Sequence, residues 1–385
     1  MKILFFGADY PPTGGGIATF SYELIHFTSK HDEVEKIKVV IFGNSDPRSE
    51  KLDSKIDLIT YKKINFFYTG WKTLFVFIKN KDYDIFHSLN LFPIGFWIAL
   101  WSKVFRKKSL VTFYGTDACD ARASKKTLIL KKWTISNVLQ ALTISEFTKN
   151  QTNIKYKFKD NLIKVIYPIV PKALLSSNYT KNNGNGNSDS DVLQIKNSYS
   201  IDNNTFVIIS VARLVKRKGT EFLIKAVSKI NDDNIKLFII GNGPEKENLT
   251  KLVTDLNLNN KVFILGKVDD IIPYYNLAHV SVLPSYMMVD DGDFEGLGLV
   301  LLEAQSYGVS VIGTRSGGIP EAFDDGITGI LVEEQDIEGL EKALIKLKDN
   351  RELLNTFSSN TKSFLEKRFG YDNTINKYIE LCKSL

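Results

Sequence analysis

Cationic side chains follow a strand-like run in the second half of the sequence. Residues 206–212 are largely apolar, and the loop behind them carries four cations before a helix pattern begins near Thr220. In a doubly wound sheet, the loops at the carboxyl ends of parallel strands face the ligand crevice. Arg213 and Lys218 in this loop therefore carry the charge needed to neutralise a diphosphate leaving group. The alternative is a solvated charge run without a ligand.

A second loop of small residues also leads into a helix pattern. Glu295 is followed by Gly296 and Gly298, then Glu303 comes two turns into the helix, and Gly-Gly-Ile-Pro-Glu occupies residues 317–321. Backbone N–H groups of such a loop can bind a phosphate or a sugar hydroxyl, and a carboxylate in the first turns can accept from a ribose diol. Two glutamates eight residues apart mean little alone. Their order with the glycines indicates a binding site.

Glycines also follow the first strand-like run, at residues 2–7. Gly14, Gly15 and Gly16 precede a helix pattern that starts at Ile17, an arrangement that lets N–H groups approach a phosphate. The spacing is not Gly-x-Gly-x-x-Gly, and no Gly-Lys-Ser/Thr follows, so the motif is neither a dinucleotide fingerprint nor a P-loop. A plain turn is the alternative.

The elements that position these loops alternate between strand-like and helix-like stretches. A chain of 385 residues exceeds the size at which one core keeps growing, so two domains are expected. The alternation predicts an α/β fold with two doubly wound parallel sheets. We predict a first domain at 1–172, a linker or insertion at 173–204 that includes the polar run 176–191, a second domain at 205–363, and a helix at 364–385 that packs back onto the first domain. The predicted strands are 2–7, 37–43, 84–88, 109–114, 138–144, 206–212, 236–241, 261–265, 280–283 and 310–313.

The charge is divided unevenly along the chain. Residues 1–170 contain 26 Lys and Arg against 15 Asp and Glu, a balance of +11, whereas the rest contain 24 against 29, a balance of −5. The first half is thus expected to meet something anionic, such as a membrane surface, or to present a solvated lysine face. The basic amphipathic segment from Arg122 to Trp133 is the predicted membrane contact, with an ordinary surface helix as the alternative.

Other features of the composition favour a cytoplasmic protein. Met1-Lys2 leads directly into a strand, without the pattern of a signal peptide, and two cysteines are too few for a disulfide framework. The apolar stretch 89–105 is shorter than about 18 residues and contains Pro93, so we expect a buried crossover helix and no membrane span. His87 ends a strand, where it either points into the cleft or is satisfied by neighbours.

These motifs resemble the retaining glycosyltransferases of family 4, which have the GT-B fold, over nearly the whole chain. The resemblance implies that Arg213 and Lys218 hold the donor diphosphate, that Glu295 contacts the transferred sugar and that Glu303 binds the ribose. It implies no cofactor and no metal, only a nucleotide-diphosphate sugar as donor substrate. The motifs that carry it, with the further residues it assigns to donor binding, are Gly14-Gly15-Gly16, 211–214 with Lys218-Gly219, 241–244, Phe294-Glu295-Gly296-Leu297-Gly298-Leu299, Glu303 and 317–321.

Two positions depart from the family pattern. Tyr114 occupies the place of the usual histidine before Gly-x-Asp, where a phenol with a pKa near 10 is no ready base at neutral pH, and Asp117 remains as an orienting carboxylate. The loop 286–293 is longer than usual and contains Asp-Asp-Gly-Asp. We interpret it as a solvated loop, with a metal site as the alternative, and its resemblance to mannosyltransferases of phosphatidylinositol mannosides favours GDP-mannose.

We therefore predict a metal-independent hexosyltransferase with Glu295, Asp117 and Tyr114 as catalytic residues. It would move mannose or glucose to a hydroxyl of a glycan or lipid-linked acceptor in the synthesis of cell-surface polysaccharide or glycolipid, in the cytoplasm or at the cytosolic membrane face. A catalytically degenerate binder of nucleotide sugars or polyanions is the alternative. The sequence lacks the glycine fingerprint of a nicotinamide oxidoreductase, and no nucleic-acid-binding module is recognisable in it.

Overall fold

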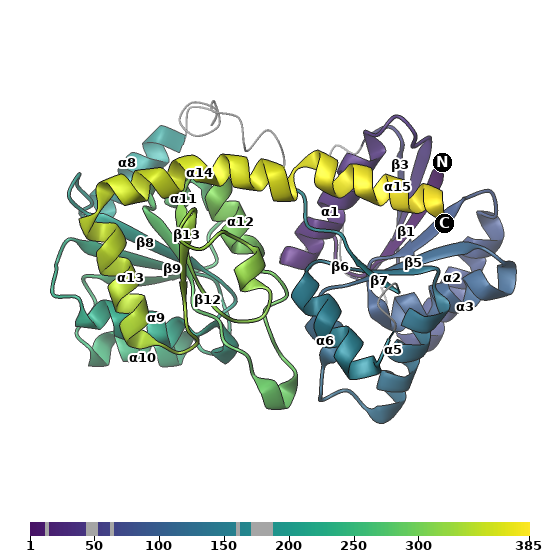
Figure 1. Ribbon diagram of the computed structural model, residues 1–385, viewed down its shortest axis with the longest axis horizontal. Helices are drawn as coiled ribbons and strands as arrows, with labels where there is room; N and C mark the ends of the chain where they lie inside the picture. The colour runs from purple at the N-terminus through teal and green to yellow at the C-terminus, as the bar shows by residue number, and fades with distance from the viewer. Residues whose placement is uncertain (12–14, 44–52, 62–64, 159–161, 171–187) are drawn as a thin grey trace. The chain divides into compact units, whose positions relative to one another are not determined.

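The computed structural model describes residues 1–11, 15–43, 53–61, 65–158, 162–170 and 188–385. The chain divides into two compact units. The first consists of Met1–Ile169, Asp290–Gly292 and Tyr371–Leu385, and the second consists of Val170–Val289 and Asp293–Gly370. Each unit is a parallel sheet with helices on both faces (Figure 1). The predicted α/β architecture of two Rossmann-like domains is confirmed.

The sheet of the first unit has the strand order β3-β2-β1-β4-β5-β6-β7, with every pairing parallel. β1 is central, and its apolar side chains from Ile3 to Phe6 are fully buried, as expected for a strand covered on both faces. The order reverses between β1 and β4, which pair with Ile3 opposite Ile85. The strands are β1 (Lys2–Gly7), β2 (Lys36–Phe42), β3 (Ile56–Tyr61), β4 (Ile85–Ser88), β5 (Lys108–Phe113), β6 (Gln140–Thr143) and β7 (Ile163–Val165).

Polar side chains cap several helices of this unit. Asn65, Ser124 and Ser145 each accept a hydrogen bond from a backbone N–H of the first turn. The stretch 89–105 forms η2 and α3, whose Ile94, Ile98 and Ala99 are buried. The helices are α1 (Gly16–Ser29), α2 (Phe66–Lys79), η2 (Leu91–Gly95), α3 (Phe96–Phe105), α4 (Thr116–Cys119), α5 (Lys125–Asn137), α6 (Glu146–Tyr156), η6 (Asp372–Asn376) and α15 (Lys377–Ser384). Within the described ranges, no helix has the length and apolar character to cross a membrane.

His87 links β4 to the C-terminal helix α15. Its Nδ1 lies 2.9 Å from the hydroxyl of Tyr378, and its Nε2 lies 2.7 Å from Oγ1 of Thr112. Burial lowers the pKa of His87 to about 3, so the imidazole is neutral at physiological pH. The histidine is therefore satisfied inside the unit, which was the second of the two expected roles.

The sheet of the second unit has the order β10-β9-β8-β11-β12-β13, again parallel throughout. Leucine, isoleucine and valine side chains of β8, β9, α9 and α13 form its main core. The strands are β8 (Phe206–Val211), β9 (Ile235–Ile240), β10 (Val262–Gly266), β11 (Val280–Leu283), β12 (Ser310–Thr314) and β13 (Gly329–Val332). The helices are α8 (Ser188–Ser198), η3 (Lys216–Lys218), α9 (Thr220–Lys229), α10 (Lys246–Asp255), α11 (Ile272–Leu277), η4 (Val289–Asp291), α12 (Leu299–Ser306), η5 (Ile319–Glu321), α13 (Ile337–Asp349) and α14 (Arg351–Phe369).

The described part of the region predicted as a linker contains a helix. Residues 171–187 lie outside the described residues, but 188–198 form α8, and Val192 and Ile195 pack against a small core that includes Phe238. The chain joins the second unit at Val170, and the helix predicted at 364–385 is divided between α14, which ends at Phe369, and the short helices η6 and α15 of the first unit.

Candidate active site

The loops after β8 and β11 meet in the second unit. These two strands are neighbours at the point where the strand order reverses, and such a switch point is where open α/β sheets bind ligands. Gly219 adopts φ 65°, and a Cβ there would lie 2.0 Å from the carbonyl oxygen of Pro284. Only glycine permits this approach of the two loops.

Two cations from the first loop pair with two carboxylates from the second. Arg217 Nε lies 3.0 Å from Oδ1 of Asp293, and its Nη1 lies 3.0 Å from Oε2 of Glu295. The ammonium group of Lys218 pairs with the same Glu295 oxygen. We call these four residues the charge cluster. It is electrically neutral as a whole, and its side chains are between 11% and 23% exposed, so a ligand can reach it while water screens it only partly.

Glu295 is held in its ionised form by this cluster. Burial raises the pKa of its carboxyl group, but the charges of Lys218 and Arg217 lower it by more, so the pKa lies below its usual value. Glu295 is therefore a hydrogen-bond acceptor at every physiological pH.

The glycine loop behind Glu295 ends at an uncapped helix. Gly298 is the N-cap of α12 with φ 88°, and no side chain accepts from the first turn of that helix. The loop rests on the Gly-Gly-Ile-Pro-Glu motif, where the N–H of Gly318 donates to the carbonyl oxygen of Glu295 at 2.8 Å. A Cβ at Gly317 would lie 2.2 Å from that same oxygen, which explains the glycine. The first-turn N–H groups of α12, which no side chain among the described residues caps, and the helix dipole suit an anion.

Glu303 lies one turn further along α12 in a different electrostatic environment. Burial raises its pKa to about 7, and the hydroxyl of Tyr275, which donates to Oε2 across 3.4 Å, only partly offsets the shift. Tyr275 in turn stacks on Tyr307 with ring centroids 5.3 Å apart. No cation among the described residues forms an ion pair with Glu303, so this carboxyl group titrates near neutral pH.

Arg213 lies outside the charge cluster. Its side chain is exposed and forms no ion pair with any residue in the described ranges. The backbone beside it is fixed, because the N–H of Leu214 donates to the carbonyl oxygen of Asn242 at 2.9 Å. Arg213 is thus available to a ligand at the carboxyl end of β8, and its predicted role at the diphosphate stays a prediction.

The first unit has its own switch point, between β1 and β4. Gly15 is the N-cap of α1 with φ 123°, Gly16 begins the helix, and Gly14 lies outside the described residues. Asn90 links the two strand ends, since its Oδ1 accepts from the N–H of Ala8 at 2.7 Å and its Nδ2 donates to Asp9 at 3.2 Å. The sequence did not point to either polar residue.

Tyr114 and Asp117 both lie inside the first unit. Tyr114 is 8% exposed, its hydroxyl makes no hydrogen bond of normal geometry, and burial raises its pKa well above the usual value, with a small opposing effect from Ser21. The Asp117 carboxylate accepts from three backbone N–H groups of its own loop, at 2.9 to 3.0 Å. Burial raises the pKa of Asp117, while these bonds and Lys131 oppose the shift. In this conformation both residues organise the loop, and their catalytic roles remain predictions.

Backbone hydrogen bonds fix the conformation of the long loop 286–293. Met288 and Asp293 exchange two backbone hydrogen bonds, and Asp293 belongs to the charge cluster. The N–H of Ala121 donates to the carbonyl oxygen of Asp291 at 3.0 Å. Asp293 is therefore an ion-pair partner of Arg217 and not a solvated side chain as expected. In the part of the chain that the structure describes, no three His, Cys, Asp or Glu side chains are grouped as metal ligands.

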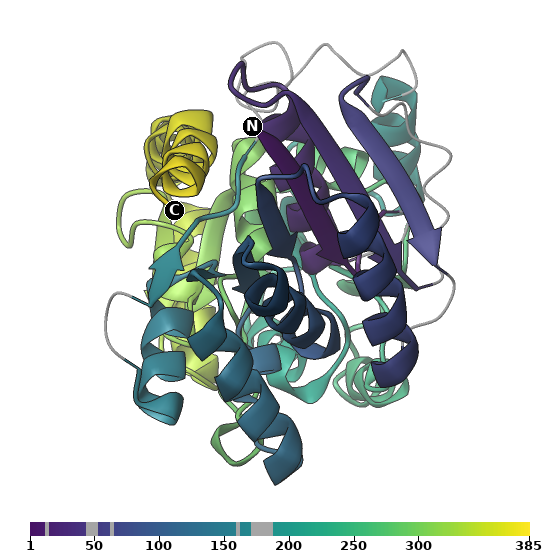
Figure 2. The ribbon, with the colours of Figure 1, turned by 90° about the vertical axis from the view of Figure 1, so that its right-hand side faces the viewer.

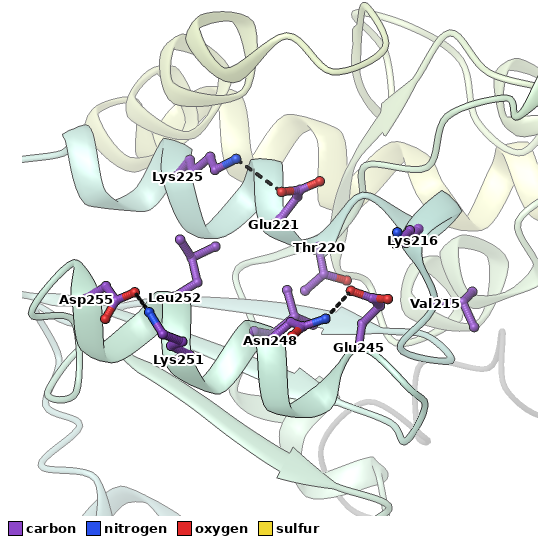
Figure 3. A pocket seen from close by; sticks show the side chains of 11 residues that line it. Val215, Lys216, Thr220, Glu221, Lys225, Glu245, Asn248, Lys251, Leu252 and Asp255 are labelled. Carbon is purple, nitrogen blue, oxygen red and sulfur yellow. Dashed lines mark hydrogen bonds and ion pairs between the residues drawn. The ribbon is translucent and has the colours of Figure 1, made fainter.

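A pocket of about 460 Å³ lies beside the charge cluster, between α9 and α10 (Figure 3). Its charged side chains largely pair with each other, Lys225 with Glu221 and Lys251 with Asp255. None of the site residues predicted from the sequence lines it. We therefore place the candidate active site at the charge cluster and not in this pocket.

Two family models match the chain. The model described as Glycosyl transferases group 1 matches residues 191–364, and the model described as Glycosyltransferase Family 4 matches residues 14–173. The chain belongs to the family 4 type of glycosyltransferases. The resemblance that the motifs indicated is thereby confirmed.

The names of this glycosyltransferase's relatives specify different reactions. The N-acetyl-alpha-D-glucosaminyl L-malate synthase of Bacillus anthracis is 26% identical over 303 residues, which are 78% of this chain and 74% of the relative. A GDP-mannose-dependent monoacylated alpha-(1-6)-phosphatidylinositol monomannoside mannosyltransferase of Corynebacterium glutamicum is 39% identical over 150 residues, 38% of this chain and 39% of the relative.

Solved structures establish the fold of this glycosyltransferase as GT-B. Alr3699/HepE of Anabaena, crystallised with UDP, aligns with a TM-score of 0.80 at 20% identity over 100% of both chains. A glycosyltransferase of Rickettsia africae aligns with a TM-score of 0.79 at 22% identity, over 99% of this chain and 98% of its own.

The candidate site of this glycosyltransferase contains three residues that the sequence did not single out, namely Arg217, Asp293 and Tyr275. Arg217 and Asp293 had a usable signal, because opposite charges follow strands on both sides of the switch point. Tyr275 had none, since it lies on α11, far from any motif.

Proposed function

We propose that this glycosyltransferase moves a hexose of the mannose or glucose type from a nucleotide-diphosphate sugar to a hydroxyl of a glycan or lipid-linked acceptor, with retention of configuration and without a metal. The observation that supports this most directly is the charge cluster beside the uncapped N-terminus of α12. Cations, the N-terminus of a helix without a side-chain cap and an ionised carboxylate lie at the switch point of the second unit, which is what a sugar diphosphate requires.

In this proposal the residues of the site have separate roles in transfer and in donor binding. Lys218, Arg217 and Arg213 neutralise the diphosphate as the bond between it and the sugar C1 breaks and the electron pair passes to the diphosphate oxygen. The acceptor oxygen bonds to C1, and its proton goes to a leaving phosphate oxygen, so no protein base is needed. Glu295 accepts from a sugar hydroxyl, and Glu303 accepts from the ribose diol.

A donor diphosphate has to exchange partners with the charge cluster. Lys218 and Arg217 are already neutralised by Glu295 and Asp293, so the diphosphate must share or replace those ion pairs. This exchange releases Glu295 toward the sugar at the moment the phosphates arrive. Until the donor binds, the two cations therefore remain in ion pairs with the two carboxylates.

The donor is proposed to be GDP-mannose or a related nucleotide hexose. The name of the Corynebacterium glutamicum relative specifies GDP-mannose, whereas the Anabaena structure with the same fold contains UDP. Both support a nucleoside diphosphate as the leaving group. We propose that the enzyme acts in the cytoplasm, in the synthesis of cell-surface polysaccharide or glycolipid, and that its basic first half meets an anionic membrane surface.

A non-catalytic binder of nucleotide sugars is the second candidate, and the buried hydroxyl of Tyr114 is the observation that favours it. Nucleotide release in the presence of acceptor separates the two. Steady release of free nucleotide would exclude the binder, whereas donor binding without turnover over a broad acceptor panel would support it.

A thermal-shift screen against UDP, GDP, ADP and their sugar conjugates tests the proposed function. A ligand at 100 times its dissociation constant adds about 2.7 kcal/mol to the free energy of unfolding. We expect one base to stabilise the wild type selectively and Lys218→Ala to lose that effect, while the exposed neighbour variant Lys216→Ala keeps it. If no nucleotide shifts the transition of the wild type, the charge cluster is not a donor site.

A further inference from the structure

Helix α2 of the first unit presents large apolar side chains to solvent. Phe67 is 82% exposed, Trp71 71%, Phe75 47% and Ile78 50%. Their spacing of four, four and three residues places them along one side of the helix. We call these four residues the outer stripe. Figure 2 shows α2 on the outside of the first unit, with no other element of that unit drawn over its outer side.

The opposite side of α2 is buried, with small residues in its first half and Val76 and Phe77 in its second half. Thr69, Gly70 and Thr73 are buried, and a Cβ at Gly70 would lie 2.5 Å from Cε2 of Trp97. The indole of Trp101 donates to Thr73 Oγ1 at 3.1 Å. The helix therefore lies close against α3 through Gly70 and Thr73, and Val76 and Phe77 of its last turns enter the core of the unit. It thus carries large apolar side chains on its outer side as well as on its buried side, whereas an ordinary surface helix has a polar outer side.

The outer stripe exceeds what scattered surface residues explain. Three exposed aromatic side chains together offer roughly 400 Å² of apolar surface, and patches of this size on soluble proteins mark interaction sites. Trp97 and Trp101 donate their indole N–H groups inside the unit, whereas Trp71 has no such bond to any residue in the described ranges.

The charge around the outer stripe selects its partner. On α2 itself the charged residues are Lys72 and Lys79, and the helix contains no Asp or Glu. Lys79 extends over the ring of Phe75 at 4.3 Å, and Lys72 lies 5.2 Å from the ring of Tyr61, so cations flank the apolar side chains directly. An apolar stripe bordered by lysines matches a surface that is apolar inside and anionic outside.

We propose that α2 is the membrane anchor of this protein and lies in the interface of an anionic lipid bilayer. Phe67, Trp71 and Phe75 insert among the acyl chains near the headgroups, and Lys72 and Lys79 contact the lipid phosphates. The segment from Arg122 to Trp133, which the sequence favoured, is a weaker contact. In the described part of α5, Ile129 is the large apolar side chain that is exposed, and Lys131 is buried.

This inference deepens the proposed function, because it specifies the membrane contact of an enzyme that uses a lipid-linked acceptor. It can fail independently, since α2 is on the first unit and the charge cluster is on the second. Donor-nucleotide stabilisation in the thermal-shift screen reports on the cluster, and the difference in vesicle binding between wild type and a stripe variant reports on the stripe.

Flotation with lipid vesicles tests the anchor. The full chain is mixed with vesicles of phosphatidylcholine alone or with added phosphatidylglycerol, and the variant Phe67→Ser/Trp71→Ser/Phe75→Ser is compared with Ile154→Ser. Ile154 is a matched control, because its side chain is 71% exposed, as is that of Trp71, but it lies on α6. We expect binding to anionic vesicles only, weakened by raising salt from about 0.05 M to about 0.5 M, and a loss of about tenfold in the triple variant but not in Ile154→Ser.

The fluorescence of Trp71 provides a second measurement, which does not depend on whether the triple variant folds. Brominated lipids in anionic vesicles should quench the emission of the wild type, and Trp71→Phe should remove most of that quenching. The proposal is overturned if the wild type stays off anionic vesicles, if the triple variant binds as well as the wild type, or if bromolipids do not quench. A lipid-free dimer that the triple variant abolishes would also overturn it, because a second copy of the chain would then cover the stripe.

Discussion

Replacing Glu303 by glutamine should stabilise the second unit at neutral and alkaline pH. Burial raises the pKa of this carboxyl group from 4.5 to about 7, so the folded chain binds a proton that the unfolded chain has released between these values. The stability contributed by the protonated form is therefore present below pH 4.5 and is lost as the pH rises to about 7. Glutamine carries no such proton, so the variant should lack this loss.

The size of the effect follows from the shift. The rise of the pKa from 4.5 to about 7, at about 1.4 kcal/mol for each pH unit, corresponds to about 3.5 kcal/mol, and because the side chain is partly exposed we expect about 2 kcal/mol at pH 8. At pH values near 4.5, the free energy of unfolding should depend on pH in the same way in the wild type and the variant. The variant should lose donor affinity throughout, if Glu303 accepts from the ribose.

The assay has to report on the second unit. Trp71, Trp97, Trp101 and Trp133 all lie in the first unit, and the sequence contains four tryptophans, so their emission does not follow unfolding of the second unit. Urea unfolding followed by far-ultraviolet circular dichroism, with hydrogen exchange of α12 as a local probe, serves instead. Glu366→Gln is the matched control, because Glu366 is exposed on α14 in the same unit.

Equal pH dependence in wild type and Glu303→Gln would refute the reasoning. So would an equal gain in Glu366→Gln, since the effect would then come from net charge and not from burial of one carboxyl group. A destabilised Glu303→Gln at pH 8 would mean that the carboxylate has a stabilising partner that burial does not reveal.

Three further outcomes are expected. Lys218→Ala should weaken donor-nucleotide binding at least tenfold, by about 1.4 kcal/mol or more, whereas Lys216→Ala should change it little, measured by calorimetry. Gly219→Ala should lower the melting temperature, with a cost above about 1 kcal/mol, because its Cβ would lie 2.0 Å from the carbonyl oxygen of Pro284; an unchanged melting temperature would contradict the loop geometry. The imidazole of His87 should show no titration between pH 5 and 8 by NMR, since its pKa is about 3.

Strand prediction from the sequence succeeded in the centre of each sheet and at the edge strand β10, and failed at the other edges. β3, β7 and β13 were missed, and all three are edge strands. Central strands are buried on both faces and appear as continuous apolar runs, whereas β3 is only partly buried along its length and β7 has three residues. An edge strand therefore carries a weaker pattern, and only the register with its neighbour identifies it.

The sequence predicted the types of residue in the candidate site better than it predicted which of them form ion pairs. The sequence indicated cations after β8 and Glu295 after β11, but four cations occupy that loop and their order does not reveal which ones turn toward the glutamate. The short helix η3 makes that choice, because it orients Arg217 and Lys218 toward Asp293 and Glu295 while Arg213 stays exposed. Such a turn depends on contacts with Pro284, which lies 65 residues away from Gly219 in the sequence.

The outer stripe of α2 shows a different limit. Apolar residues at helical spacing usually indicate the buried side of a helix, so the stripe has the same pattern as an ordinary core face. What distinguishes it is that another side of α2 is the buried one, with Gly70 and Thr73 against Trp97 and Trp101 and with Phe77 in the core. Which of the two apolar sides is buried depends on partners from other elements and is not visible in α2 itself.

The two glutamates of the site have opposite electrostatic environments, and this difference assigns them separate tasks. Glu295 is ionised at every physiological pH because Lys218 and Arg217 outweigh its burial, whereas Glu303 has no cationic partner among the described residues and titrates near pH 7. Paired carboxyl groups whose environments separate their pKa values typically have different roles. If Glu303 accepts from the ribose, donor binding should weaken below pH 7, where that carboxyl group is protonated, while the charge at the transfer centre is unchanged. The pH dependence of this enzyme would then originate in nucleotide recognition and not in the chemical step.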